Sequence, residues 1–253
     1  MTQPSSNDNN INQEHTFVSH LIELRSRLIR TILFVLLVFM ALLYFANDIY
    51  SFLATPLFKH LPSGSNMIAT EVASPFLAPF KLTVYTAIFV SMPYLIYQLW
   101  AFIAPGLYIN EKRFVMPLLY SSILLFYVGI VFAYFIVLPL LFSFFTTVAP
   151  EGVTVMTDIS RYLDFVLKIF FAFGLAFEVP IATMLVVWAG LTTVESLKNN
   201  RPYIIVSAFV IGMLLTPPDI ISQILLAVPI WGLFELGLLL SSKLAHENTG
   251  DEL

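Results

Sequence analysis

The chain has 253 residues, of which 58% are hydrophobic and only 11% are charged. A soluble domain of this size would carry about 25% charged residues. Here the charges lie between long apolar runs, so the composition predicts a polytopic membrane protein. The formal net charge of −4 argues against a nucleic-acid partner. Cysteine is absent, which excludes disulfide bonds, thiolate metal sites and cysteine nucleophiles.

Six apolar segments predict an all-α membrane protein with six spanning helices, because a spanning helix needs about 20 apolar residues. The segments are Leu28–Ala46, a stretch inside Leu82–Asn110, a stretch inside Phe114–Pro150, Tyr162–Trp188, Tyr203–Leu215 and Ile220–Leu240. The last two are short and are separated by a Pro-Pro turn. At 1.5 Å per residue the fifth spans only about 20 Å, so either the bilayer thins around this pair or the pair is re-entrant.

The distribution of Lys and Arg predicts the orientation. Eight of these residues fall on one side of the predicted spans, against two on the other or four at most, which puts both termini in the cytoplasm. The eight are Arg25, Arg27, Arg30, Lys112, Arg113, Lys198, Arg201 and Lys243. We expect one polytopic domain over residues 1–253, with a polar cytoplasmic tail over 1–19 and a short one over 243–253. In the first outer loop, Ile49–Phe58 is apolar but too short to span, which favours a helix at the interface.

Two acidic residues on the predicted cytoplasmic side differ in their local partners. Glu23 has Arg27 one helical turn later, the favoured order for an ion pair. Glu111 has no cation three or four residues away. A carboxylate at the membrane edge without a local partner can receive an external cation, best a guanidinium, whose planar fork bonds it bidentately. The alternatives are a local surface ion pair for Glu23 and a solvated or topogenic loop acid for Glu111.

Glu178 lies in the middle of the fourth predicted span, two residues before Pro180. An ionisable group inside the membrane is costly and marks a functional site by default, and no basic residue lies one turn away. We expect a neutral carboxyl that can donate a hydrogen bond, with Thr216 and Gln223 as candidate partners. The carboxyl either forms a polar clasp between spans four, five and six or docks a polar group of a partner helix.

Two other charged residues within spans have simpler interpretations. Lys168 follows Asp164 by one turn, which predicts an ion pair and a snorkelling lysine near the outer interface. Glu235 lies close to the cytoplasmic end of the last span, where we expect it to reach the headgroups. Nucleotide-binding, zinc-protease and serine-hydrolase motifs are absent from the sequence. We therefore expect no enzyme, no cofactor and no metal site.

Seven segments together resemble the TatC family, the multispanning core subunit of the twin-arginine protein translocase. They are His20–Leu28, Ala73-Ser74-Pro75-Phe76, Gln98–Arg113, Phe177–Pro180, Arg201-Pro202-Tyr203, Met213–Asp219 and Pro229–Gly237, in the family's order and spacing. The likeness covers about residues 15–243. It implies a receptor and core component of a translocase that exports folded proteins with twin-arginine signal peptides across the bacterial cytoplasmic (inner) membrane. The family works on proton-motive force without ATP.

The resemblance also implies a signal-peptide-binding surface on the cytoplasmic side. Glu111 matches the family's signal-binding glutamate, with Phe102 nearby on the same surface. Glu23 with Arg25 matches the N-terminal segment that supports this glutamate.

Further residues match positions connected with partners and export. Glu178 matches the family's intramembrane glutamate, with Thr216 and Gln223 as the polar cluster linked to the single-span TatA and TatB subunits. Pro56 and Asp219 match outside-facing positions where substitutions impair export. The resemblance also implies oligomers of the chain itself.

A proton- or ion-coupled small-solute transporter is the alternative from a different class, with Glu178 as the coupling carboxyl. The absence of an internal sequence repeat and of a second mid-membrane charge counts against it. An intramembrane enzyme is a more distant alternative because no nucleophile–base set is present.

Overall fold

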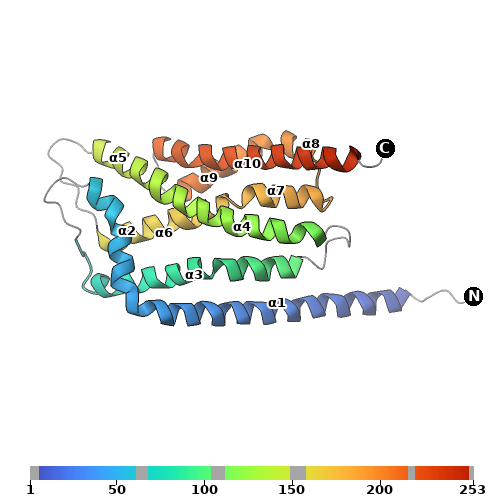
Figure 1. Cartoon of the computed structure of the whole chain (residues 1–253), viewed down its shortest axis with the longest axis horizontal. Coiled ribbons are helices and arrows are strands. Elements are labelled where there is room, and N and C mark those ends of the chain that lie inside the picture. The colour runs from blue at the N-terminus through green and yellow to red at the C-terminus, as the bar shows by residue number, and fades with distance from the viewer. Residues whose placement is uncertain (1–5, 61–67, 104–111, 149–157, 216–219, 251–253) are drawn as a thin grey trace, which may run out of the picture.

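The computed structural model describes residues 6–60, 68–103, 112–148, 158–215 and 220–250 of the 253-residue chain. Regular structure in these ranges is helical, apart from one isolated bridge between Ile68 and Asp158. The helices are α1 (Ser6–Leu42), η1 (Leu43–Phe45), α2 (Ala46–His60), α3 (Ser74–Ile103), α4 (Lys112–Phe132), η4 (Ala133–Val137), α5 (Leu138–Val148), α6 (Ile159–Ala176), α7 (Val179–Trp188), α8 (Val194–Asn199), α9 (Arg201–Leu215) and α10 (Ile220–Gly250). The start of α1 and the end of α10 lie at the same end of the bundle (Figure 1).

Five helical segments are long and apolar enough to cross a membrane, and α9 forms a shorter sixth. The five are Leu21–Leu53, Ser74–Phe102, Met116–Phe145, Ile159–Trp188 and Gln223–Lys243. The predicted all-α membrane fold is therefore confirmed. The fifth predicted span is short, as expected, because α9 has only 15 residues. The sixth is longer than expected, since α10 continues past Leu240 to Gly250.

The first helix lies at the rim of the bundle. It packs on α3, and the rest of the protein buries none of its most apolar window. Leu37 and Met40 are more than 60% exposed, which suits a surface covered by lipid. Helix α1 begins at Ser6, so the predicted polar tail is helical over residues 6–19.

Helix α2 leaves α1 at a steep angle after the short 3-10 turn η1 (Figure 1). It contains the apolar piece Ile49–Phe58, so the helix predicted there is confirmed. Leu53 is buried, and its carbonyl accepts a hydrogen bond from the Tyr162 hydroxyl at 2.9 Å. Helix α2 is thereby tied across the outer end of α6.

The packed centre of the molecule lies between α3, α4 and α6. Its fully buried large side chains include Phe126, Phe173 and Leu163. Helices α4 and α6 approach closely because each has a glycine at the crossing. A Cβ atom on Gly129 would lie 2.5 Å from the Phe173 carbonyl oxygen, and one on Gly174 would lie 2.6 Å from the Phe126 ring. Small residues allow such an approach between membrane helices.

The third span changes register at η4, a π turn of five residues between α4 and α5. A π turn inserts one extra residue into an α-helix, and Pro139, which cannot donate a backbone hydrogen bond, follows directly. Before the turn in sequence, α4 packs mainly on α6. After the turn, α5 packs on α2. Leu138 and Leu141 are both fully buried in this second contact.

The fourth span is broken rather than continuous. Helix α6 ends at Ala176 and α7 begins at Val179, with Pro180 in its first turn. The Glu178 N–H donates to the Leu175 carbonyl at 3.0 Å, and the Ala182 N–H donates to the Glu178 carbonyl at 2.8 Å. Glu178 therefore lies at the joint between two helices, where its side chain leaves the regular helical pattern.

Asp158 connects the two outer loops. The residue is only 7% exposed and caps α6, accepting hydrogen bonds from the Ser160 and Arg161 N–H groups at 2.9 and 3.0 Å. Its second oxygen accepts from the Thr70 hydroxyl at 2.7 Å and from the Thr70 N–H at 2.9 Å. The Thr70 hydroxyl first, then the Arg161 N–H, lower the pKa of Asp158 to about 2, since both favour the ionised carboxyl.

Asp158→Asn should lower the melting temperature of the detergent-solubilised protein at neutral pH. The pKa of Asp158 is lowered on folding from 3.8 to about 2, so its stabilisation is present above pH 3.8 and is lost as the pH falls towards 2. Thermal unfolding between pH 7 and pH 2 checks this, and the variant should lose less stability than the unmodified chain over the acid range. Asp48→Asn, at an exposed position of α2, is the control. Equal melting temperatures at pH 7 would contradict the capping role.

Candidate functional site

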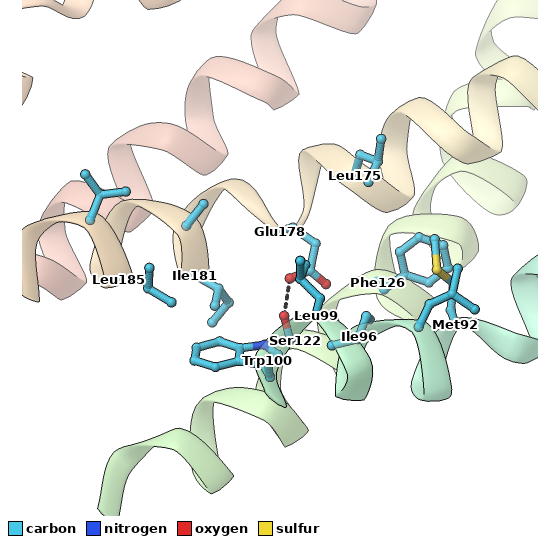
Figure 2. Close-up of a pocket in the computed structure, with 13 residues that line it drawn as sticks. Met92, Ile96, Leu99, Trp100, Ser122, Phe126, Leu175, Glu178, Ile181 and Leu185 are labelled. Atoms are coloured by element: carbon cyan, nitrogen blue, oxygen red, sulfur yellow. Dashed lines mark hydrogen bonds between the residues drawn. The ribbon is translucent and has the colours of Figure 1, made fainter. Parts of the chain in front are cut away.

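The Glu178 carboxyl faces a cavity of about 490 Å³ between α3, α4 and the α6–α7 joint. The Ser122 hydroxyl of α4 donates a hydrogen bond to Glu178 Oε2, as Figure 2 shows. The other oxygen, Oε1, is buried and has no hydrogen-bond partner in the described part of the chain. The lining residues are Met92, Leu95, Ile96, Leu99, Trp100, Ser122, Phe126, Leu175, Glu178, Ile181, Ala182, Leu185 and Val186.

This arrangement leaves one strong polar atom in an apolar pocket. A buried oxygen without a partner costs about 1–3 kcal/mol, so a ligand or partner helix that brings a hydrogen-bonding group to Glu178 Oε1 would gain that energy. The pocket has one carboxyl, and no three His, Cys, Asp or Glu side chains gather anywhere in the described ranges to hold a metal ion. The site is suited to binding a polar group within the membrane.

Ser122 is a partner of Glu178 that the sequence did not predict. Gln223 does not bond to the carboxyl; it lies on α10 beside Gly212 of α9, where a Cβ would come within 3.4 Å of the Gln223 carbonyl oxygen. Thr216 lies outside the described residues. The turn before α7 directs Glu178 toward α4, and the direction of a side chain at such a turn cannot be derived from hydropathy. The third span contains several hydroxyl side chains, including the adjacent Ser121, so the sequence did not single out Ser122.

At the end of the bundle predicted to face the cytoplasm, the predicted ion pair between Glu23 and Arg27 is confirmed. Glu23 Oε1 accepts hydrogen bonds from Arg27 Nε at 2.9 Å and Nη2 at 2.6 Å. Arg27 also donates to Gln98 Oε1 at 3.0 Å and to the Ala101 carbonyl at 3.2 Å. Gln98 in turn donates to the Tyr94 hydroxyl at 2.7 Å. These contacts fasten α1 to the last turns of α3, and sequence reasoning missed both Gln98 and Tyr94.

Two of the other three predicted signal-binding residues lie in the described part of the chain. Phe102, half-buried, follows Ala101 directly, while Arg25 is exposed on α1. Helix α3 ends at Ile103 and α4 begins at Lys112, so Glu111 comes immediately before α4 but lies outside the described residues.

The two outer-face predictions fall on undescribed parts of the chain. Pro56 belongs to helix α2, but its side chain is outside the description, as is the whole of Asp219.

Two ion pairs between helices correct the predicted partners of Asp164 and Glu235. Asp164 pairs with Lys81 of α3 instead of Lys168. Glu235 pairs with Arg201 of α9 at 2.7 Å instead of reaching the headgroups. In both cases the nearest cation belongs to a neighbouring helix, and its position depends on helix rotation, which the spacing of charges along one segment does not determine.

Comparisons with known proteins agree with this architecture. The family described as "Sec-independent protein translocase protein (TatC)" matches residues 19–229. A protein with that description from Azotobacter chroococcum is 59% identical over 234 residues, covering 92% of this chain and 92% of its own. One from Haemophilus influenzae is 60% identical over 232 residues, covering 92% of this chain and 91% of its own. The Escherichia coli K12 protein is 57% identical over 224 residues, covering 88% of this chain and 87% of its own.

A solved structure shares the fold. The "Crystal Structure of Twin Arginine Translocase Receptor- TatC" superposes with a TM-score of 0.80 at 40% identity, covering 88% of this chain and 98% of that one. These likenesses do not favour the small-solute transporter. The chain therefore belongs to the TatC family and is a multi-pass membrane component of a bacterial Sec-independent protein translocase.

Proposed function

We propose that this chain is the receptor for the twin-arginine signal peptides of folded cargo proteins and the core subunit of a translocase in the bacterial inner membrane. It acts by binding and assembly, without catalytic chemistry or a cofactor, and draws on proton-motive force. Family membership and the solved receptor of the same fold support this proposal.

The observation that carries the proposal is the attachment of α1 to the end of α3 by Arg27. Its contacts to Glu23, Gln98 and the Ala101 carbonyl bring an acidic side chain of α1 beside the turn that contains Phe102. The two hydrogen bonds that Arg27 donates to Glu23 both go to Oε1. The Glu23 side chain is 38% exposed. A second guanidinium can therefore approach Glu23 without displacing Arg27.

A signal peptide with two adjacent arginines would place one guanidinium on Glu111 and the other on Glu23. Arginine suits both sites because its fork can bond a carboxylate bidentately, whereas lysine offers a single point charge. The apolar part of the signal would then lie against the bundle. A polar group on a TatA or TatB helix, or on a second copy of this chain, would bond to Glu178 in the cavity.

Binding of a synthetic signal peptide to the detergent-purified full chain tests the receptor function. Changing the peptide's Arg-Arg to Lys-Lys, or the protein by Glu111→Ala, should weaken binding about 10- to 100-fold, because each removes a charge-assisted hydrogen bond worth about 1.5–3 kcal/mol. Fluorescence anisotropy of a labelled peptide measures the dissociation constant.

Glu195→Ala is the matched control, since it removes a glutamate carboxyl at an exposed position of α8. This variant should bind the peptide with unchanged affinity. Equal affinity for both peptides, together with an unaffected Glu111→Ala variant, would reject the receptor function.

A further inference from the structure

An ion pair and a further lysine one helical turn away lie on the surface of α3 and α6, in the half of the bundle away from the start of α1. Lys81 of α3 forms an ion pair with Asp164 of α6, and Lys168 lies one helical turn beyond Asp164 on the same face of α6. We call Lys81, Asp164 and Lys168 the outer charge cluster. It carries a formal charge of +1.

The cluster is open to its surroundings. The side chains of Lys81 and Asp164 are 47% and 42% exposed, and Lys168 is exposed as well. Within the described residues, Lys168 forms no ion pair, and Asp164 pairs with Lys81 instead. Among the described residues, no carboxylate therefore pairs with the ammonium group of Lys168.

The position of Lys168 along the span makes its unpaired ammonium group unfavourable in free energy. The span Ile159–Trp188 has 30 residues, about 45 Å of helix, which exceeds a hydrocarbon core of about 30 Å by roughly 7 Å at each end. Lys168 is nine residues from the outer end, so its Cα lies roughly 6 Å inside the hydrocarbon. A lysine there extends its side chain to the interface, where lipid phosphates are the anions within reach.

The surface below the cluster is apolar and suits an acyl chain. Phe171 and Leu175 follow Lys168 at helical spacing and are 41% and 46% exposed. Leu175 also lines the cavity that holds Glu178, as Figure 2 shows. From Lys168 to Leu175 is about 10 Å along the helix. An amphiphile with an anionic head and an apolar tail matches both parts of this face.

We propose that the outer charge cluster binds the phosphate of an anionic phospholipid of the outer leaflet, with an acyl chain lying on Phe171 and Leu175 toward the Glu178 cavity. The site is distinct from the proposed signal-binding surface, which lies at the opposite end of α3. It does not depend on the receptor function.

Native mass spectrometry of the full chain with phosphatidylglycerol or phosphatidylcholine tests the affinity. Lys168→Gln should weaken phosphatidylglycerol binding about fivefold, whereas Asp164→Asn should strengthen it, because it removes the acid and releases Lys81. Opposite effects of the two variants would not arise from a merely structural role. Lys198→Gln, at an exposed lysine of α8 outside the long spans, is the control and should behave as the unmodified chain.

A probe at the cluster locates the lipid. Tryptophan introduced by Phe171→Trp should be quenched more by phosphatidylglycerol with brominated acyl chains than by brominated phosphatidylcholine, and Lys168→Gln should remove this difference. Inorganic phosphate should not compete, since it has no acyl chain. Equal quenching by both lipids, unchanged lipid affinity of Lys168→Gln, or full competition by phosphate would overturn the proposal.

Discussion

Glu178→Leu should reduce export of a twin-arginine cargo to background while leaving the bundle folded. The cavity around Glu178 is lined mainly by apolar side chains, which can accommodate leucine. The substitution removes a buried oxygen that has no partner among the described residues, and the freed Ser122 hydroxyl can bond to a carbonyl in the preceding turn of its own helix. Loss of export without loss of melting temperature would separate binding of a polar group from stability.

Glu178→Gln distinguishes hydrogen bonding from proton transfer at this site. Glutamine retains an oxygen that can accept from Ser122 and adds an N–H donor, so export should largely survive if the carboxyl only forms hydrogen bonds. Export assays in cells and thermal unfolding of the purified variants give the two readouts. A glutamine variant as inactive as leucine would indicate proton coupling, and full export by the leucine variant would exclude a role for the carboxyl.

Gly129→Ala should destabilise the bundle by about 1–3 kcal/mol, the range typical of overpacked cores. The added methyl group would lie 2.5 Å from the Phe173 carbonyl oxygen and 3.1 Å from the Phe177 Cβ. Neither atom can move away without shifting the α6 backbone, so α4 and α6 would have to separate. Thermal unfolding in detergent should show the loss.

Two other glycines provide controls for this prediction. A Cβ on Gly232 of α10 meets nothing within 4 Å, so Gly232→Ala should be neutral or stabilise the helix by up to about 1 kcal/mol. Gly174→Ala should cost less than Gly129→Ala, because its nearest neighbour is the Phe126 ring, which can tilt. If Gly129→Ala unfolded at the same temperature as Gly232→Ala, the close crossing of α4 and α6 would not contribute to stability.

Hydropathy was sufficient to predict the helical spans because each one must satisfy its own backbone within an apolar run. Proline did not predict local breaks reliably: Pro180 lies at the start of α7, but Pro93 and Pro229 lie inside continuous helices. The last span was predicted to end at Leu240 and ends at Lys243, whereas the helix α10 itself continues to Gly250. Its last turns are polar, and polarity ends a membrane span without ending a helix.

Contacts within one helix could be predicted only in part, since Glu23 pairs with Arg27 but Asp164 does not pair with Lys168, and contacts between helices could not be predicted. The pair of Glu23 and Arg27 follows from a spacing of four residues. The partners of Glu178 and Asp164, namely Ser122 and Lys81, lie on other helices. Finding them requires the rotation of each helix about its axis, which is set by packing at positions such as Gly129 and is not encoded in any single segment.

The π turn at Ala133–Val137 has a consequence for how substitutions in the third span act. One additional residue shifts the sequence positions that follow it by about 100° around the helix axis. The spacing of buried positions in α4 therefore does not continue unchanged into α5. Phe135 and Ile136 face outward at the turn, 68% and 46% exposed, whereas Leu138 and Leu141 are sealed inside. Because the turn accommodates the extra residue, a single deletion here would restore a regular α-helix and keep both inner rows facing the core, whereas a deletion elsewhere in the span would turn one row toward the lipid.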